Sequence, residues 1–185
     1  MTEKQKLLIV GLGNPGKEYA FNRHNIGFMV IDELGKKYNV SFQSDKNSIF
    51  GKIELENKFI FLLKPTTYMN LSGNPVSSFL SKNGILPNCM LVVHDEIDIP
   101  FEDIRLKFQG GHAGHNGLRN IIDRVGSKDF HRLRFGVGRP PRSDFSVADF
   151  VLSNFTKEEK EKLYGLLNKS ILEIDKWIKN FLDVA

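Results

Sequence analysis

Leu7-Leu-Ile-Val-Gly-Leu-Gly-Asn-Pro-Gly16, with Arg23-His24-Asn25 shortly after it, is the stretch around which the chain is organised. Its apolar beginning predicts a short buried strand. The strand runs into a glycine-rich turn and a polar segment, and apolar residues at helical spacing resume at Ile26. Because loops at strand ends carry reactive groups on a fixed scaffold, this segment is a candidate functional site.

The three glycines match G-x-G-x-x-G, the fingerprint of dinucleotide-binding proteins, but the surrounding residues disfavour that interpretation. A phosphate site needs a helix that starts inside the motif with free backbone N–H groups. Pro15 lacks an N–H group, and residues 16–23 show no apolar helical stripe. A glycine turn without function would explain Gly11 and Gly13, but not the polar residues Asn14, His24 and Asn25 beside them.

The composition is that of an ordinary globular protein. Its 185 residues suit one compact domain spanning residues 1–185. We expect no membrane span and no signal peptide, because no apolar run is long enough and the first six residues are polar. A single cysteine, Cys89, fits a reducing cytoplasm, and the net charge of +4 weakly favours a polyanionic partner.

Strand-like and helix-like segments alternate along the chain. The patterns predict strands over residues 7–10, 49–55, 59–63, 90–93, 104–108 and 130–138, and helices over residues 26–38, 75–82, 118–125 and 156–178. Residues 39–47 and 139–144 are expected to be loops. This order predicts an α/β fold, with a central, mostly parallel mixed sheet and helices on both faces.

Three of these strands end in polar segments, which contain His24, Asn70 and Asp95 respectively. If the strands are parallel, their carboxyl ends form one crevice where these side chains converge. A carboxylate that holds one nitrogen of a histidine leaves the other free to accept a proton from water, which is general-base chemistry. Asparagine amides can stabilise the developing oxyanion of acyl transfer. A capping or loop role for His24 and a turn-forming role for Asp95 stay open.

Other chemistries fit the residues less well. His112-x-x-His115 with Asp95 resembles a metal site, but the pair lies among glycines and lacks the helical spacing of common zinc motifs. Cys89 borders an apolar run, which favours a small core residue over a nucleophile. Ser72 lacks the G-x-S-x-G context of a nucleophile elbow.

Taken together, the motifs resemble the bacterial-type peptidyl-tRNA hydrolase family. The matching segments occur in the family's order and cover nearly the whole chain: Val10-Gly-Leu-Gly-Asn-Pro-Gly16 with Tyr19, Arg23-His24-Asn25 with Gly27, residues 64–73 (KPTTYMNLSG), His94-Asp-Glu-Ile-Asp98, residues 110–117 (GGHAGHNG) and residues 130–138 (FHRLRFGVG). Two departures are visible: Tyr68 stands where the family often has Phe, and Ala113 replaces a common glycine.

The resemblance implies hydrolysis of the ester that joins a peptide to the terminal ribose of tRNA. His24 would activate water, Asp95 would orient His24, and Asn14 would help distinguish blocked from free aminoacyl groups. The family acts in general as a cytoplasmic monomer without cofactor or metal. The residues expected to contact the peptide or the tRNA are Tyr19, Tyr68, Asn70, Asn116, His115, Arg105, Lys107 and Arg134, the last three also being explicable as a solvated basic surface.

Two further functional classes remain open at this point. A tRNA-binding module without turnover would need only the basic residues. A metallohydrolase would lose activity in excess chelator. The His24 and Asp95 pair favours the ester hydrolase.

Overall fold

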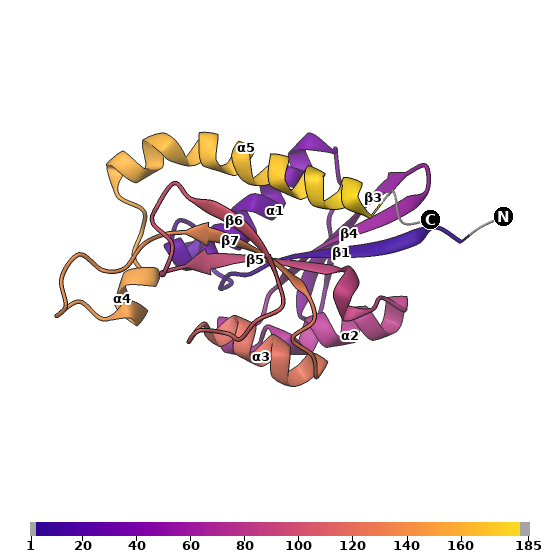
Figure 1. Cartoon of the computed structure of the whole chain (residues 1–185), viewed down its shortest axis with the longest axis horizontal. Helices are drawn as coiled ribbons and strands as arrows, with labels where there is room; N and C mark the ends of the chain where they lie inside the picture. Colours follow the sequence, from indigo (N-terminus) through magenta and orange to yellow (C-terminus); the bar gives the residue numbers. More distant parts are fainter. Residues whose placement is uncertain (1–2, 182–185) are drawn as a thin grey trace.

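A computed structural model describes residues 3–181 of the chain. The described residues form one seven-stranded sheet flanked by helices (Figure 1). Its strand order is β2-β3-β4-β1-β5-β7-β6. The strands are β1 (Gln5–Gly11), β2 (Gln43–Asp45), β3 (Ser48–Leu55), β4 (Lys58–Pro65), β5 (Met90–Glu96), β6 (Ile104–Phe108) and β7 (His131–Gly136).

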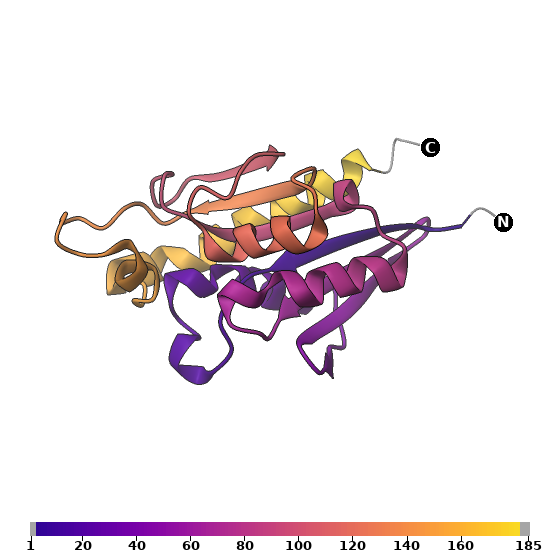
Figure 2. The same cartoon turned by 90° about the horizontal axis from the view of Figure 1, so that it is seen from below.

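The centre of the sheet is parallel and its edges are antiparallel. Strands β4, β1, β5 and β7 run parallel to one another, whereas β3 and β6 pair antiparallel with β4 and β7. Helices cover both faces: α1 and α5 lie on one, and α2 and α3 lie side by side on the other (Figures 1 and 2). This confirms the α/β prediction. The helices are α1 (Ile26–Lys37), α2 (Gly73–Asn83), α3 (Asn116–Val125), α4 (Val147–Val151) and α5 (Lys157–Asn180).

Strand β1 is buried on both faces, which explains its continuous apolar run. Leu7 and Ile9 belong to the core beneath α1 and α5, whereas Leu8 and Val10 belong to the core beneath α2 and α3. All four side chains are fully buried. Because side chains alternate across a strand, an unbroken apolar run is what a strand between two helical layers requires.

Helix α1 contacts the sheet through backbone atoms. A Cβ atom on Gly27 would lie 2.3 Å from the backbone nitrogen of Leu12 and 2.5 Å from the carbonyl oxygen of Val93. A Cβ atom on Gly11 would lie 2.2 Å from the carbonyl oxygen of Gly27. Glycine at these positions lets the start of α1, with His24 just before it, approach the ends of β1 and β5.

The predicted elements are largely confirmed, with differences at their ends. The capping box at Thr156 begins α5, and Gly84 ends α2 in a left-handed conformation with φ 63°. Strand β5 extends through Glu96, so that Asp95 belongs to the strand and not to the loop after it. The prediction of a loop over residues 39–47 is wrong in part, because Gln43–Asp45 pairs antiparallel with β3 as strand β2. Helix α4 lies in a segment for which no element was predicted. Among residues 3–181, no helix combines the length and apolar character needed to cross a bilayer.

Candidate active site

One pocket, with a volume of about 680 Å³, lies at the carboxyl ends of the central parallel strands. It receives residues from the ends of β1, β4 and β5, as the parallel arrangement predicts. The sequence-predicted residues that line it are Asn14, His24, Tyr68, Asn70, Asp95, His115 and Asn116.

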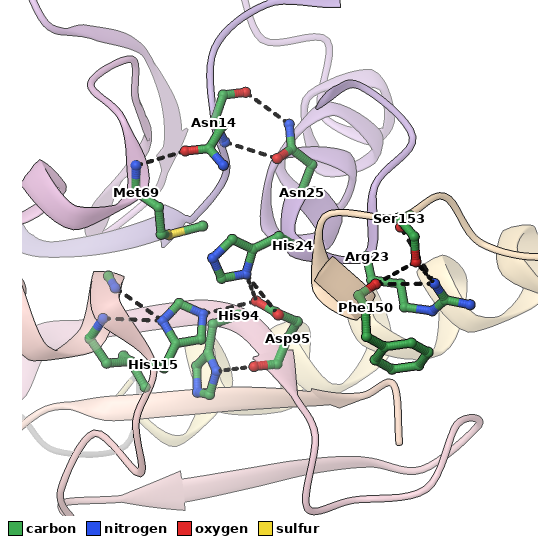
Figure 3. Close-up of polar contacts among 12 residues, drawn as sticks. Asn14, Arg23, His24, Asn25, Met69, His94, Asp95, His115, Phe150 and Ser153 are labelled. Carbon is green, nitrogen blue, oxygen red and sulfur yellow. Dashed lines mark hydrogen bonds and ion pairs between the residues drawn. The ribbon is translucent and has the colours of Figure 1, made fainter. Parts of the chain in front are cut away.

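His24 and Asp95 are hydrogen-bonded to each other in this pocket. Nδ1 of His24 lies 3.0 Å and 2.8 Å from the two carboxylate oxygens of Asp95. Because an ionised carboxylate only accepts hydrogen bonds, Nδ1 carries the hydrogen and donates it. Nε2 of His24 is directed away from Asp95 (Figure 3), so that its lone pair is available to accept a proton.

Asp95 also accepts a hydrogen bond from a second histidine. Nε2 of His115 lies 2.8 Å from Oδ1 of Asp95. Nδ1 of His115 accepts hydrogen bonds from the backbone N–H groups of Gly117 and Leu118, which caps α3. These two donors place the hydrogen of His115 on Nε2. Both ring nitrogens of His115 are therefore engaged by the protein, which favours a role in holding Asp95 over the predicted contact with substrate.

His24 and Asp95 shift each other's pKa. Burial lowers the pKa of His24, but the charge of Asp95 and its hydrogen bond outweigh burial, so that the pKa is raised above 6.5. Burial alone would raise the pKa of Asp95, but the charges and hydrogen bonds of His24 and His115 hold it well below its usual range. Asp95 thus stays ionised, and His24 titrates at a higher pH than a free histidine.

His94 supports the dyad from beneath. Its Nδ1 donates to the backbone carbonyl oxygen of Asp95 at 2.8 Å, and its ring packs edge-on against His115 (Figure 3). Burial, with a smaller contribution from His115, lowers the pKa of His94 to about 3. His94 is therefore neutral at ordinary pH and adds no positive charge beside His24. Its role was not predicted from the sequence, where it reads as one more polar residue after the strand.

Asn14 is held in one orientation by three hydrogen bonds. Its backbone N–H and carbonyl groups pair with the side-chain amide of Asn25 at 2.8 and 2.9 Å. Its Oδ1 accepts the backbone N–H of Met69 at 2.7 Å (Figure 3). This bond fixes the orientation of the amide, so that its NH₂ group, which can only donate, is directed to a ligand in the pocket.

Ala113 adopts a left-handed conformation with φ 48° in the loop that lines one side of the pocket. The left-handed region costs an L-residue about 1–2 kcal/mol, whereas glycine enters it without steric cost. The substitution noted in the sequence therefore falls at a position whose backbone suits glycine.

Several predicted residues lie outside the pocket lining. Tyr19 lies in a short 3-10 helix (Lys17–Tyr19), half-buried, and Arg105, Lys107 and Arg134 lie on β6 and β7. One wall of the pocket was not predicted at all. It consists of Val147, Ala148, Val151 and Leu152, from α4 and the residue after it.

The cluster of His24, Asp95 and His115 also has the composition of a metal site. His24, Asp95 and His115 each offer one ligand atom, and these atoms lie within 4.8 Å of one another. A metal ion would need the lone pairs of the two nitrogens that face Asp95. Both nitrogens carry hydrogens instead, and His115 cannot move its hydrogen to Nδ1 without losing two backbone hydrogen bonds. The donor set therefore fits a hydrogen-bonded cluster better than an ion.

Known proteins are similar to this chain in both sequence and fold. A family model described as peptidyl-tRNA hydrolase matches residues 8–185. The peptidyl-tRNA hydrolase of Thermodesulfovibrio yellowstonii is 43% identical over 170 residues, covering 91% of this chain and 90% of its own length. That of Geobacillus thermodenitrificans is 48% identical over 154 residues, covering 83% and 82%.

The structural comparison agrees with the sequence comparison. The crystal structure of peptidyl-tRNA hydrolase from Acinetobacter baumannii superposes with a TM-score of 0.84 at 39% identity, covering 97% of this chain and 94% of that one. The family model, the relatives and the crystal structure each cover most of the chain. The chain therefore belongs to the peptidyl-tRNA hydrolase family.

Proposed function

We propose that this protein hydrolyses the ester between a peptide, or an N-blocked aminoacyl group, and the terminal ribose of tRNA, with His24 as the general base. Membership of the family supports the reaction. The observation that carries the residue assignment is the His24–Asp95 contact, in which Asp95 engages Nδ1 and leaves Nε2 for water.

The reaction then proceeds by water attack. Nε2 of His24 removes a proton from a water molecule as its oxygen bonds to the ester carbonyl carbon. The oxyanion that forms is stabilised by amide N–H donors, for which Asn70 and Asn116 in the pocket lining are the candidates. When the C–O bond breaks, the proton passes from His24 to the ribose oxygen. The products are a peptide carboxylic acid and free tRNA.

Asp95 and Asn14 have supporting roles in this proposal. Asp95 fixes the tautomer and orientation of His24 and stabilises the imidazolium form. Asn14 donates its NH₂ group to a carbonyl oxygen of the peptide. We propose further that residues 1–185 act as a single domain and a monomer, in the cytoplasm where translation supplies peptidyl-tRNA, without a metal or cofactor.

A release assay tests this function. Purified protein is mixed with N-acetylaminoacyl-tRNA in excess chelator, and free tRNA is measured over time. We expect release by the parent protein and a loss of ~10²–10⁴-fold for His24→Ala, because general acid–base catalysis contributes that much. His131→Gln, which lies beside Trp177 and away from the pocket, serves as the control. Binding of tRNA without release would indicate a tRNA-binding protein, and release that fails only in chelator would indicate a metallohydrolase.

A further inference from the structure

Arg23 is a buried cation directly next to the proposed base. It lies in the short 3-10 helix Arg23–Asn25 and is 4% exposed. A buried guanidinium is costly unless its donors are paired. Its Nη1 donates to the carbonyl oxygen of Phe150 at 3.2 Å and to both oxygens of Ser153 (Figure 3). Its Nη2 donates to Oε1 of Glu159 at 2.7 Å.

The same guanidinium also lies near two aromatic rings. Its central carbon lies 4.1 Å from the ring centroid of Phe150 and 5.8 Å from that of Phe155. The Glu159 oxygen that it contacts also accepts the backbone N–H of Thr156, in the capping box of α5. Arg23 thus joins the segment that carries His24 to the end of α4 and the start of α5.

Helix α4 depends on such contacts for its position. It has five residues, and isolated helices of that length are unstable in water. The segment before it, residues 141–146, is exposed throughout. Phe150 and Val151 are the buried residues of α4, and Phe150 packs on Arg23. His24, by contrast, has its own anchor in Asp95, which does not involve Arg23.

We infer that Arg23 is a positioning residue that holds α4 in place as the apolar wall of the pocket. This inference rests on the proposed function, because the wall belongs to the proposed ester-hydrolysing pocket. Without Arg23, α4 occupies its pocket-lining position for only a fraction of the time. The apparent affinity for substrate falls in proportion to that fraction, whereas bound substrate meets an intact His24. Loss of Arg23 therefore raises KM and leaves kcat and the pH profile nearly unchanged.

Two variants and one matched control test the inference. Arg23→Lys keeps the charge but loses the planar set of donors that reaches three acceptor residues at once. Glu159→Gln keeps an oxygen for Thr156 and removes only the charge of the ion pair. Lys37→Met breaks the ion pair of Lys37 with Asp175, which joins α1 to α5 away from the pocket. Each is assayed for KM, kcat and pH profile on N-acetylaminoacyl-tRNA, and for hydrogen exchange of residues 147–155.

We expect KM to rise ~10-fold in Arg23→Lys, as loss of about one net hydrogen bond implies, and less in Glu159→Gln, with kcat within about twofold of the parent. Residues 147–155 should exchange faster in both variants and at the parent rate in Lys37→Met. Should Arg23→Lys not fold, Glu159→Gln gives the same readouts.

Three results would overturn the inference: a parental KM with unaltered exchange, a fall in kcat with a shifted pH profile, or faster exchange throughout the chain. The second would mean that Arg23 acts on His24, and the third that it only stabilises the fold. An inactive parent would instead refute the proposed function. Hydrogen exchange of residues 147–155 would even then show whether Arg23 holds α4 in place.

Discussion

Asp95 accepts hydrogen bonds from His24 and His115, and these bonds fix which ring nitrogen of each histidine carries the hydrogen. His115 cannot move its hydrogen from Nε2 to Nδ1, because Nδ1 accepts the two backbone hydrogen bonds that cap α3. Asp95 is therefore held from one side by His115 while it holds His24 on the other. The pair His24 and Asp95 could be predicted from the sequence, because a histidine and a carboxylate each come after the apolar run of a strand. The part played by His115 could not, since it depends on which nitrogen faces α3.

Asn14 is the residue at which we expect substrate selection. A free aminoacyl-tRNA brings an ammonium group, and an amide donor offers it no compensating charge, so that its desolvation is costly. Asn14→Asp keeps an oxygen for the N–H group of Met69 and replaces the donor NH₂ with a charged oxygen. We expect kcat/KM for N-acetylaminoacyl-tRNA to fall ~10-fold or more and the preference over free aminoacyl-tRNA to narrow by a similar factor.

Asn14→Ala provides the control for this measurement, because it removes the donor without adding a charge. It should slow hydrolysis without favouring the free substrate. If Asn14→Asp lowers both rates by the same factor, Asn14 positions the substrate only, and selectivity resides elsewhere in the pocket.

At the scale of elements, the contact between α1 and the sheet depends on Gly27. A side chain there would meet the backbone of Leu12 and Val93, which cannot move aside as the end of a flexible side chain can. We expect Gly27→Ala to lower the free energy of unfolding by about 1–3 kcal/mol, as overpacking does. Urea denaturation measures the change.

Gly165 provides the matched control, because it lies inside α5 and a Cβ atom added there would have no neighbouring atom within 4 Å. Gly165→Ala should raise the free energy of unfolding by roughly 0.5–1 kcal/mol, the helix preference of alanine over glycine. Equal effects of the two substitutions would contradict the close packing at Gly27.

The elements that could be predicted are those whose patterns are local. The apolar run of β5 and the capping box of α5 are complete within a few residues of the chain. Helix α4 has no such pattern, because five residues show little periodicity and its anchor, Arg23, lies more than a hundred residues away. The apolar wall of the pocket was missed for this reason, although Arg23 itself stood in a recognised motif.

At the scale of the molecule, basic side chains gather on one face of β6 and β7. Arg105 lies opposite Arg134, and Lys107 lies opposite Arg132, so that all four share a face. Arg132 is buried and donates to the carbonyl oxygens of Gly110 and Gly111, which holds the glycine loop. The other three are the candidates for phosphate contacts. The prediction that Arg105 and Lys107 lie on one face of a strand is confirmed. Their contacts with phosphates stay predictions.

Lys107 offers the simplest test of this face. If it contacts a phosphate, Lys107→Ala should lower the slope of log binding constant against log salt by roughly one unit and raise KM, with single-turnover chemistry nearly unchanged. Lys176→Ala, on α5 across the sheet, should leave the slope at the parental value. An unaltered slope in Lys107→Ala would show that Lys107 contacts no phosphate.

The proposed roles of His24 and Asp95 are tested most directly by the single-turnover rate of ester hydrolysis as a function of pH, in the parent and in Asp95→Asn. In the parent, the rate should rise as His24 loses its proton, with a midpoint above 6.5, the value of a free histidine. In the variant, the amide oxygen is expected to keep the hydrogen bond of His115, so that the amide NH₂ faces His24. That donor forces the hydrogen of His24 onto Nε2 and removes the lone pair that accepts the proton.

We therefore expect a rate lower by ~10²–10⁴-fold in Asp95→Asn, with any residual titration at a lower pH because the carboxylate charge is gone. A variant with the parental rate and the parental midpoint would contradict these roles, because Asp95 would then neither orient His24 nor set its pKa.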